Sequence, residues 1–549
     1  MRTRRVSPDP LTAANRRFDE LWDRLYQSEH THRDALVETL LKMREHLPAD
    51  PGPRFDPAGL VYCTYGDAFP TETGNPPSPG PATTLDGLGG QMDRLKWLGV
   101  RTLWILPLLR SPGRDQGFDI SDYGEVDARF GGNAAFQRLL DRARNAGILV
   151  MFDVAINHTS NVHPWFRSAC ADPASPYRAW YHWSDTEKRF SGARPVFKGM
   201  VDSCWTWSEE AGRYYFHRFY DFQPDLNYAE PAVTAAMIRA LASWTRAGVG
   251  GFRLDAAPML WKAEGTSCEN LPETHLVIKI FRAALGILGR ESVLLAEANM
   301  PAAELREYFG DGDECHAAFH FPLLPLFWKA LHREDPRILV EARFPALPSG
   351  CSWVTFLRCH DEVALDLLPA AEREDLLSFL CREPSWVFRG GQGVSGRLFE
   401  LLGRDPEWTI LAFSILLSLP GTPVLYYGDE IASTNNERFY REKSRDTGYP
   451  DSRFIHRGPF DAERALHARV DAGSPEGKVL AGLRRMVERR ARVDGLGAVE
   501  PSLSFDGPVL VSERRASGRV LRALSNLSGR SASARGQLLG PRECRWELE

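Results

Sequence analysis

From about residue 58 onward, short apolar segments alternate with stretches that have the periodicity of amphipathic helices. The apolar segments cover residues 60–65, 102–106, 148–152, 249–254, 293–296, 319–321, 354–357 and 424–427. The helical patterns include residues 92–98, 134–145, 231–246, 275–287 and 477–492. Strands that alternate with helices form parallel sheets, so eight such strands predict an α/β chain folded as a (β/α)8 TIM barrel.

Three further segments are predicted around this barrel. Residues 1–57 are expected to form an N-terminal helical extension, because apolar residues recur at helical spacing over 12–48 before several prolines. Residues 159–228 are rich in Trp, Tyr, Phe and His and are expected to form a domain inserted after the third strand. Short β-type runs predict a small C-terminal β domain at 495–549, which leaves 58–494 for the barrel. The N-terminal extension either packs on the barrel or forms a dimer contact, so a homo-oligomer is one of the alternatives.

The bulk composition argues against several classes of protein. The 549 residues carry a formal net charge of −5, which gives no electrostatic footprint for nucleic acid. No apolar run is long enough to predict a membrane span, and the first residues lack the apolar core of a signal peptide. Nine cysteines without a CxxC spacing argue against a zinc site or a disulfide scaffold and favour reduced thiols in the cytoplasm.

Three carboxylates follow apolar strands of the predicted barrel. Asp255 ends the run that begins near Val249, Glu297 follows residues 293–296, and Asp361 comes shortly after residues 354–357. Barrels of this type keep their chemistry at the carboxyl ends of the strands, so we expect the three acids to share one site. Glycosidic cleavage needs two carboxyl groups with different roles. A lone acid after a strand more often caps a turn or a helix, and its neighbours decide between the two interpretations.

The neighbours of these acids favour chemistry. Arg253 lies two residues before Asp255 and therefore on the same face of the strand. Its guanidinium is expected to lower the pKa of Asp255 and to keep it ionised, as a nucleophile requires. Glu297 follows four apolar residues, and desolvation there favours the protonated form that a general acid needs. Asp153, near the third strand, has the plainer interpretation of orienting Arg253 or a turn.

Six stretches of the chain resemble the α-amylase-type glycoside hydrolases called family 13. They are Asp-Val-Ala-Ile-Asn-His (153–158), Gln-Pro-Asp-Leu-Asn (223–227), Gly-Phe-Arg-Leu-Asp (251–255), Ala-Glu-Ala-Asn (296–299), Leu-Arg-Cys-His-Asp (357–361) and Gly-Thr-Pro-Val-Leu-Tyr-Tyr-Gly-Asp-Glu (421–430). The resemblance implies Asp255 as nucleophile, Glu297 as acid/base and Asp361 as a third acid that holds sugar hydroxyls. It also implies a glucose-binding subsite, made of His158, Gln223, Arg253 and His360.

Within this family, further stretches resemble trehalose synthases, which interconvert maltose and trehalose. These stretches are residues 114–123, 180–186, 264–275 and 308–316. The resemblance implies that Asp115 grips the non-reducing glucose. It also implies that Phe118 is the stacking platform, at a position where the pattern more often has Tyr.

One departure from this pattern concerns calcium. Lys262 stands where trehalose synthases usually have a Glu that helps to bind the ion, although Asn157 and Asp225 match its other side-chain ligands. The loop at 66–81 also lacks the acidic run of many relatives. Because an ammonium group can replace the charge of the metal, we expect no metal and no other cofactor.

The second departure follows the eighth strand. Residues 449–458 resemble amylosucrase, a sucrose-using glucosyltransferase, as do the N-terminal helices. This resemblance implies that Arg453 pairs with Asp115 and closes the pocket behind one glucose. The alternative is that Arg453 forms an ordinary surface ion pair of little consequence.

The combined expectation is a retaining enzyme that transfers α-glucosyl groups of small α-glucosides such as maltose, trehalose or sucrose. Asp255 attacks the anomeric carbon while Glu297 protonates the leaving oxygen, with the carboxyl groups about 5–5.5 Å apart. If the released glucose re-attacks, maltose becomes trehalose. If water attacks, the enzyme is an α-glucosidase, and if another sugar attacks, it is a transglucosidase of the amylosucrase type. A non-catalytic binding protein on the same fold is the remaining alternative, and the complete set of acids weighs against it.

Overall fold

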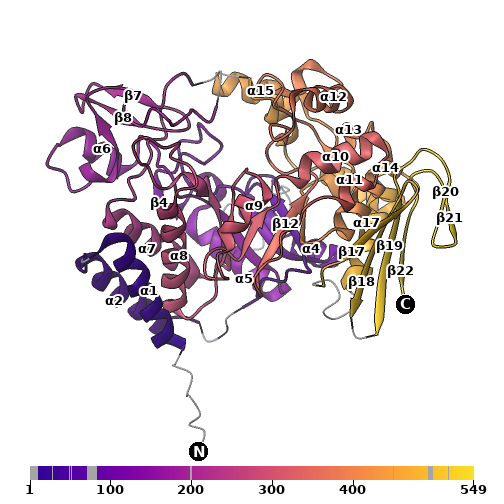
Figure 1. The fold of residues 1–549 in the computed structure, drawn as a ribbon, viewed down its shortest axis with the longest axis horizontal. Coiled ribbons are helices and arrows are strands. Elements are labelled where there is room, and N and C mark those ends of the chain that lie inside the picture. Colours follow the sequence, from indigo (N-terminus) through magenta and orange to yellow (C-terminus); the bar gives the residue numbers. More distant parts are fainter. Residues whose placement is uncertain are drawn as a thin grey trace, which may run out of the picture.

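A closed barrel of eight parallel strands forms the centre of the computed structural model (Figure 1). The structure describes residues 10–27, 29–48, 50, 52–70, 83–197, 201–448, 450–491, 499–516 and 518–549. Around the barrel the order is β1-β16-β12-β11-β10-β9-β5-β2. The strands are β1 (Leu60–Thr64), β2 (Val100–Ile105), β5 (Leu149–Ala155), β9 (Gly251–Asp255), β10 (Val293–Ala296), β11 (Ala317–Phe319), β12 (Ser352–Phe356) and β16 (Thr422–Tyr426). The predicted barrel is confirmed.

Each predicted apolar segment contains or overlaps one barrel strand, and the largest error is at β11. That strand ends at Phe319, whereas residues 319–321 were the predicted segment. The pairing begins at Ala317 and Ala318, opposite Leu295 and Ala296 of β10. Alanine has little β propensity, so the start of the strand is weakly marked in the sequence. The aromatic residues at and after its end have high β propensity, so the predicted segment lies too far toward the C-terminus.

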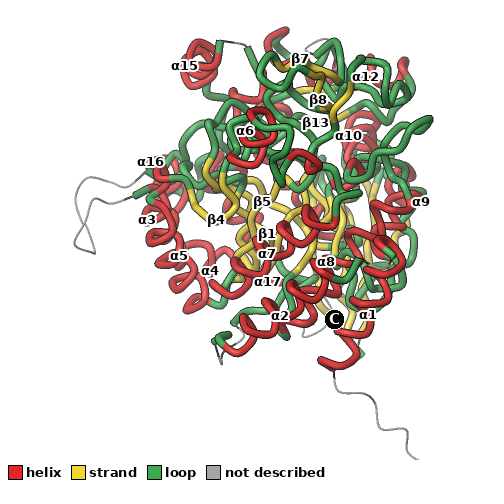
Figure 2. The backbone as a smooth tube through the Cα atoms, turned by 90° about the vertical axis from the view of Figure 1, so that its left-hand side faces the viewer, coloured by secondary structure: helices red, strands yellow, loops and turns green. Residues whose placement is uncertain are grey.

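Helices cover the outside of the barrel, as Figure 2 shows for the red helices around the yellow strands. Outside the N-terminal pair and the insert, the helices are α3 (Thr84–Gly89), α4 (Met92–Leu98), α5 (Gly132–Ala146), α7 (Pro231–Ala247), α8 (Pro272–Leu288), α9 (Ala302–Leu305), α10 (Leu323–Arg333), α11 (Arg337–Val340), α12 (Ala370–Leu380), α13 (Leu398–Leu401), α14 (Pro406–Ser418), α15 (Glu437–Thr447), α16 (Ala462–Val470) and α17 (Pro475–Ala491). Proline in the first turn and glycine after the last turn delimit α7, where Gly248 adopts φ 118°. In the part of the chain that is described, no helix has the length and apolarity needed to cross a bilayer.

The N-terminal helices α1 (Pro10–Tyr26) and α2 (Thr31–Glu45) lie against α7 and α8. The hydroxyl of Tyr26 donates to the Tyr228 carbonyl at 2.9 Å and lies 2.6 Å from the Thr234 hydroxyl. Arg44 donates to the Ile287 carbonyl at 3.1 Å. Of the two alternatives from the sequence, the structure has the helices packed on the barrel. Residues 1–9 of the predicted extension lie outside the described residues.

The aromatic-rich insert holds α6 (Pro164–Ala171) and a small antiparallel sheet in the order β6-β8-β7. Its strands are β6 (Trp183–Ser184), β7 (Trp205–Ser208) and β8 (Arg213–Phe216). A cluster of Phe190, Cys204, Trp205 and Phe216 forms its core together with Cys268, which follows β9. Figures 1 and 2 both place β7, β8 and α6 on the same side of the barrel as α12 and α15.

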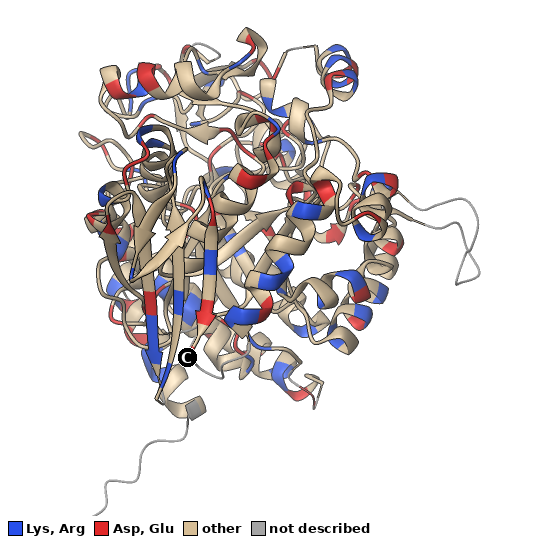
Figure 3. Ribbon diagram, turned by 90° about the vertical axis from the view of Figure 1, so that its right-hand side faces the viewer, with Lys and Arg blue, Asp and Glu red and all other residues tan. Residues whose placement is uncertain are grey.

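A C-terminal sheet with the order β17-β18-β19-β22 packs against α14. Its strands are β17 (Ser502–Asp506), β18 (Val509–Ala516), β19 (Arg519–Asn526) and β22 (Cys544–Leu548), next to the ribbon of β20 (Ala532–Ala534) and β21 (Gln537–Leu539). Trp546 Nε1 donates to the Ser414 hydroxyl at 2.8 Å, which ties the last strand to α14. Figure 3 shows basic and acidic residues interspersed on this side of the molecule. The predicted boundary at 494/495 falls within residues 492–498, outside the described residues.

Candidate active site

A cavity of about 450 Å³ lies at the carboxyl ends of the barrel strands. Its volume is within the range of pockets that bind small molecules. All but one of the predicted site residues line it: Asp115, Phe118, His158, Arg253, Asp255, Glu297, His360, Asp361 and Arg453. Gln223 is completely buried behind the wall, where its amide Nε2 donates to Asp115 at 2.9 Å. The structure therefore brings the predicted residues together.

Arg253 on β9 joins the carboxylates of three neighbouring strands. Its Nη1 donates to Asp255 at 2.7 Å and to Asp153 at 3.1 Å, and its Nη2 pairs with Glu297. The parallel register places Arg253 beside Asp153 on β5 and Leu295 on β10, so one guanidinium reaches both neighbouring strands. The predicted role of Asp153 in orienting Arg253 agrees with this contact.

Asp255 and Glu297 are in hydrogen-bond contact, which changes the expected protonation. Burial and the adjacent Glu297 raise the pKa of Asp255 well above 3.8, although Arg253 opposes them. The predicted net lowering of the Asp255 pKa by Arg253 is therefore wrong in this geometry, because burial and Glu297 outweigh the guanidinium. The physical reason is that Glu297 has competing stabilisation: it pairs with Arg253 and accepts from the Ala256 amide at 3.1 Å. Asp255 and Glu297 thus share one guanidinium, and burial beside Glu297 disfavours the ionised form of Asp255.

Asp361 is the anionic member of the site. Its carboxylate accepts from Arg453 at 2.9 Å and Arg457 at 3.1 Å and lies 3.2 Å from His360 Nε2. Burial opposes ionisation, but His360 and the two guanidiniums hold the pKa of Asp361 below its usual range. The ionised Asp361 carboxylate can accept hydrogen bonds from sugar hydroxyls.

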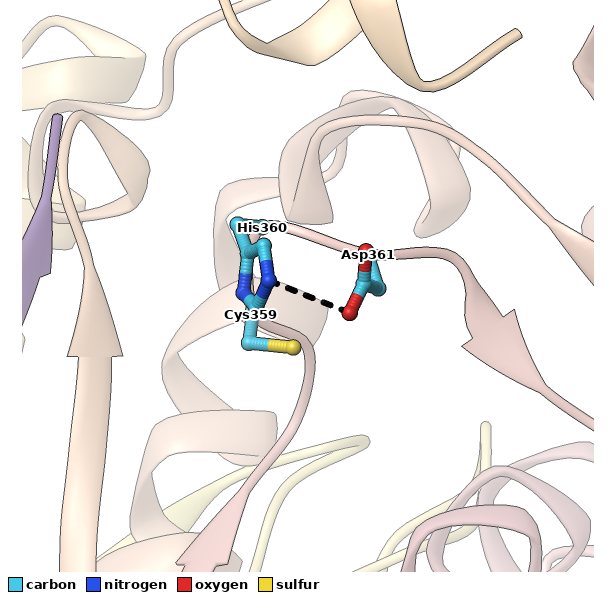
Figure 4. Close-up of side chains that lie close together, drawn as sticks. All are labelled: Cys359, His360 and Asp361. Atoms are coloured by element: carbon cyan, nitrogen blue, oxygen red, sulfur yellow. Dashed lines mark ion pairs between the residues drawn. The ribbon is translucent and has the colours of Figure 1, made fainter. Parts of the chain in front are cut away.

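Cys359, His360 and Asp361 lie close enough together to raise the question of a metal (Figure 4). The dashed ion pair between His360 and Asp361 runs within this group. Because Asp361 Oδ1 already accepts from two guanidiniums, a cation placed there would meet both positive charges. We therefore interpret the three residues as part of the sugar pocket.

The opposite wall supplies a platform and a grip for a glucose ring. The Phe118 ring stacks on His360 with centroids 5.8 Å apart. His158 Nε2 lies 3.2 Å from the Phe118 carbonyl and 3.2 Å from Gln223 Nε2. Burial lowers the pKa of His158 to about 4, so the imidazole is neutral at pH 7. Burial raises the pKa of Asp115 to about 6, against the opposing effect of Arg453.

Arg453 does not form the ion pair with Asp115 that its resemblance implied. It makes hydrogen bonds through Nε and Nη2 to Asp451, at 2.7 to 3.1 Å, and through Nη1 to Asp361. Arg453 lies in the 3₁₀ turn Ser452–His456, where the Asp451 side chain caps the turn and fixes the guanidinium within reach of Asp361. Arg453 is buried at the site, so the alternative of a surface ion pair is also wrong.

A family model described as "Alpha amylase, catalytic domain" matches residues 64–353, which is more than half of the chain. This chain belongs to the α-amylase family. The match covers Asp255 and Glu297 and ends before Asp361. Asp361 belongs to the same site because it lines the same cavity and lies beside His360.

Two curated members of the α-amylase family are similar in sequence. The chain is 44% identical over 353 residues to a trehalose synthase/amylase of Mycobacterium tuberculosis, covering 63% of this chain and 58% of that protein. It is 44% identical over 357 residues to a trehalose synthase of Thermus thermophilus, covering 64% of this chain and 36% of that protein. The chain thus matches less than two thirds of the length of either relative.

The solved structure of an isomaltulose synthase from Klebsiella sp. LX3 superposes with a TM-score of 0.66. The superposition covers 90% of this chain and 99% of that one, at 20% sequence identity. At this identity the likeness shows the shared barrel fold of the family.

Lys262 occupies the position that the family resemblance gives to calcium. Its ammonium lies 2.9 Å from Asp225 Oδ2 and donates to Asn157 Oδ1 at 2.8 Å and to the Leu226 carbonyl at 3.5 Å. The Lys262 and Asp225 side chains are both fully buried. The oxygens that would face a metal thus face an internal cation, and a calcium ion does not fit this donor set.

Arg457 and Arg389 are among the cavity residues that the sequence interpretation missed. Arg457 donates to the His360 carbonyl at 2.8 Å as well as to Asp361, and it lies within the stretch 449–458 in which only Arg453 was singled out. Arg389 lines the cavity from the turn between β14 (Val387–Phe388) and β15 (Gly393–Val394). All three residues of the run Arg389-Gly390-Gly391 adopt positive φ in this turn. The two glycines were the signal in the sequence, because glycine favours such a conformation.

Proposed function

We propose that this protein is a retaining α-glucosyl-transferring enzyme that interconverts maltose and trehalose. The observation that carries the proposal is the contact between Asp255 and Glu297 on adjacent strand ends, both held by Arg253. Inverting glycosidases keep their carboxyl groups about 6.5–9.5 Å apart to admit a water, whereas retaining enzymes keep them closer. Relatives at 44% identity named trehalose synthase support the isomerase within the family.

The first half of the reaction forms a covalent intermediate. A maltose that enters the cavity separates the two carboxyl groups, which leaves Asp255 as the carboxylate and Glu297 as the protonated acid. The Asp255 carboxylate then forms a bond to the anomeric carbon of the non-reducing glucose. The glycosidic bond breaks as Glu297 gives its proton to the leaving oxygen, which frees one glucose. Arg253 remains bonded to Asp255 and neutralises the charge that moves between the two carboxyl groups.

The second half returns the glucosyl group to the released glucose. The freed glucose turns, and its anomeric hydroxyl attacks the bound glucosyl carbon while Glu297 removes the hydroxyl proton. The bond to Asp255 breaks and trehalose is formed, which leaves Asp255 as a carboxylate and Glu297 protonated, ready for the next cleavage. Hydrolysis is the same step with water as the attacking group, so the outcome depends on keeping water out. The nine cysteines, all free in the structure, support the further proposal of a cytoplasmic location.

The test is incubation of the purified protein with maltose and, separately, with sucrose, followed by chromatography of the products. Trehalose with little glucose is the expected result from maltose. Glucose alone would identify an α-glucosidase, and fructose or glucan from sucrose would identify an amylosucrase-type enzyme.

Replacement of the nucleophile tests the mechanism. We expect Asp255→Ala to lower kcat by about 10⁴-fold or more on every substrate, because no other group can form the intermediate. Asp141→Ala, at an exposed acid on α5, is the matched control and should retain full activity. Retained turnover in Asp255→Ala would exclude Asp255 as the nucleophile.

A further inference from the structure

A second pocket lies at the opposite end of the barrel from the catalytic cavity. It has a volume of about 350 Å³ and is lined by Asp50, Gly52, Pro53, Arg54, Asp56, Arg101, Arg144 and Gly147. Arg54 and Asp56 precede β1, Arg101 is at the start of β2, and Arg144 and Gly147 precede β5. The pocket is therefore built at the amino ends of the strands, whereas the catalytic residues follow their carboxyl ends.

Four arginines gather at this pocket without a protein partner. Arg54, Arg101 and Arg144 line it, and Arg290, just before β10, lies directly behind its wall. Among the hydrogen bonds and ion pairs of the described residues, none involves the side chain of any of the four. Arg253 and Arg453 of the catalytic cavity differ, since each of them bonds to two or more carboxylates.

Arg290 gives the most direct sign of a missing acceptor. Only 8% of this residue is exposed, and its Nη1 is buried without a hydrogen-bond partner. Burial and the like charge of Arg144 lower the pKa of Arg290. A buried guanidinium without an acceptor is costly, and an anion that also contacts Arg144 removes this cost.

Gly52 is the part of the wall that lies against the Arg290 and Arg144 guanidiniums. A Cβ at this position would lie 3.3 Å from Arg290 Nη2 and 3.8 Å from Arg144 Nε. Gly52 adopts φ 71°, and its amide donates to Asp50 Oδ1 at 2.9 Å, which holds the turn. The backbone therefore passes close to both guanidiniums at a residue without a side chain.

The charge and shape of the pocket define the chemistry of its ligand. Four arginines and the two aspartates Asp50 and Asp56 leave a formal charge of +2. A phosphate monoester carries close to two negative charges at neutral pH, and guanidinium forks match its oxygens. We propose that this pocket binds a phosphorylated small molecule through Arg54, Arg101, Arg144 and Arg290.

The two acids at the pocket suit a polyol attached to the phosphate. Asp50 and Asp56 each use one oxygen to hold a local backbone amide, that of Gly52 and that of Ala58. Each carboxylate has a second oxygen that can accept from a sugar hydroxyl. A hexose monophosphate combines both groups, whereas inorganic phosphate satisfies the arginines alone.

The test is titration calorimetry of the full-length protein with inorganic phosphate, glucose 6-phosphate and glucose at constant ionic strength. We expect glucose 6-phosphate to bind, and Arg144→Gln and Arg290→Gln each to weaken it by about tenfold, because each removes a charge-assisted hydrogen bond. Tighter binding of glucose 6-phosphate than of phosphate would assign the acids to the sugar, and equal affinities would assign free phosphate as the ligand.

Two variants at exposed pocket arginines and one control variant separate an effect on binding from an effect on folding. Arg54→Gln and Arg101→Gln change exposed side chains and should also weaken binding several-fold. Arg438→Gln, at an exposed arginine on α15, should bind like the unchanged protein. Absence of binding of both phosphate compounds overturns the proposal. So does unchanged affinity in Arg101→Gln and Arg144→Gln, which would place the bound sugar phosphate in the catalytic cavity.

Discussion

Arg253 links the chemistry of the site to the stability of the barrel. Its guanidinium is almost completely buried, and it faces the carboxylates of Asp153, Asp255 and Glu297. A buried cation of this kind is stable only while its partners remain, and each partner is stable only while the cation remains. Because the three acids stand on three adjacent strands, the network also fixes the strand ends relative to one another.

A second internal cation, Lys262, allows a prediction about metal dependence. We expect Lys262→Met to lower the free energy of unfolding by about 3–5 kcal/mol, because Asp225 would remain buried without a partner. Lys262→Glu should be destabilised too, but its carboxylate joins Asn157, Asp225 and the Leu226 carbonyl in an oxygen set that suits Ca²⁺. Differential scanning calorimetry with Ca²⁺ and with a chelator measures both effects.

The two variants at residue 262 and the unchanged protein serve as controls for one another. Calcium should raise the Tm of Lys262→Glu and leave Lys262→Met unchanged. The unchanged protein should have the same Tm in calcium and in chelator. A Tm that falls when chelator is added to the unchanged protein would mean that a metal stabilises this fold after all.

The raised pKa of Asp115 predicts a pH dependence of glucose binding. The pKa of about 6 means that the carboxylate is ionised above pH 6 and protonated below it. The ionised form is the better acceptor for sugar hydroxyls, so binding strengthens as pH rises through 6 and levels off above it. We expect the inhibition constant of glucose to rise by about tenfold for each pH unit below 6.

Asp115→Asn should bind glucose more weakly at pH 7 and lack this dependence on pH. An unaltered pH profile in Asp115→Asn would assign the effect to another group.

At the scale of elements, the sequence specified the barrel better than the turns above it. Buried strands are marked by apolar residues, and helix ends by proline and glycine, so local sequence was sufficient to predict them. The partners of Arg453 were not predictable in this way, because they depend on how a short turn after β16 is oriented toward β12. The same holds for the raised pKa of Asp255, which depends on contacts between β9 and β10.

The turn between β14 and β15 is the element that closes the cavity on one side. Arg389 at its tip stacks over Phe197 of the insert at 4.9 Å and over Phe388 at 5.0 Å. Arg389 adopts φ 48°, a conformation that costs a residue with a side chain and recurs at functional sites. The arginine therefore joins the insert to the barrel loops at the wall of the cavity.

Loss of this contact is expected to shift the reaction toward hydrolysis. Removal of cation–π contacts worth about 1 kcal/mol should raise the ratio of glucose to trehalose formed from maltose by about fivefold in Arg389→Ala. The total rate of maltose cleavage should change less, because Asp255 and Glu297 are untouched. Chromatography of products at low conversion measures the ratio, with Arg382→Ala, at an exposed arginine that does not line the cavity, as control. Equal ratios in Arg389→Ala and Arg382→Ala would rule out a role of the turn in excluding water.

At the scale of the whole molecule, three distant parts of the chain enclose the cavity. The barrel strands supply the acids, the insert supplies Phe197 and Phe219, and the segments after β12 and β16 supply Arg389 and Arg453. The insert is anchored to the barrel by buried contacts such as those of Lys262 with Asp225 and Leu226. The enclosure is therefore a property of the assembled fold.

This enclosure predicts that the glucose released from maltose does not exchange with glucose in solution. Unlabelled maltose should be converted in the presence of ¹³C-labelled glucose, and the trehalose should be analysed by mass spectrometry at low conversion. If the cavity retains the freed glucose while the glucosyl group is on Asp255, the trehalose contains much less label than the surrounding glucose. Arg389→Ala should incorporate more label than the unchanged protein, because the entrance is wider. Trehalose labelled in proportion to the free glucose would show that the acceptor comes from solution, and the protein would then act as a transglucosidase that uses glucose as its acceptor.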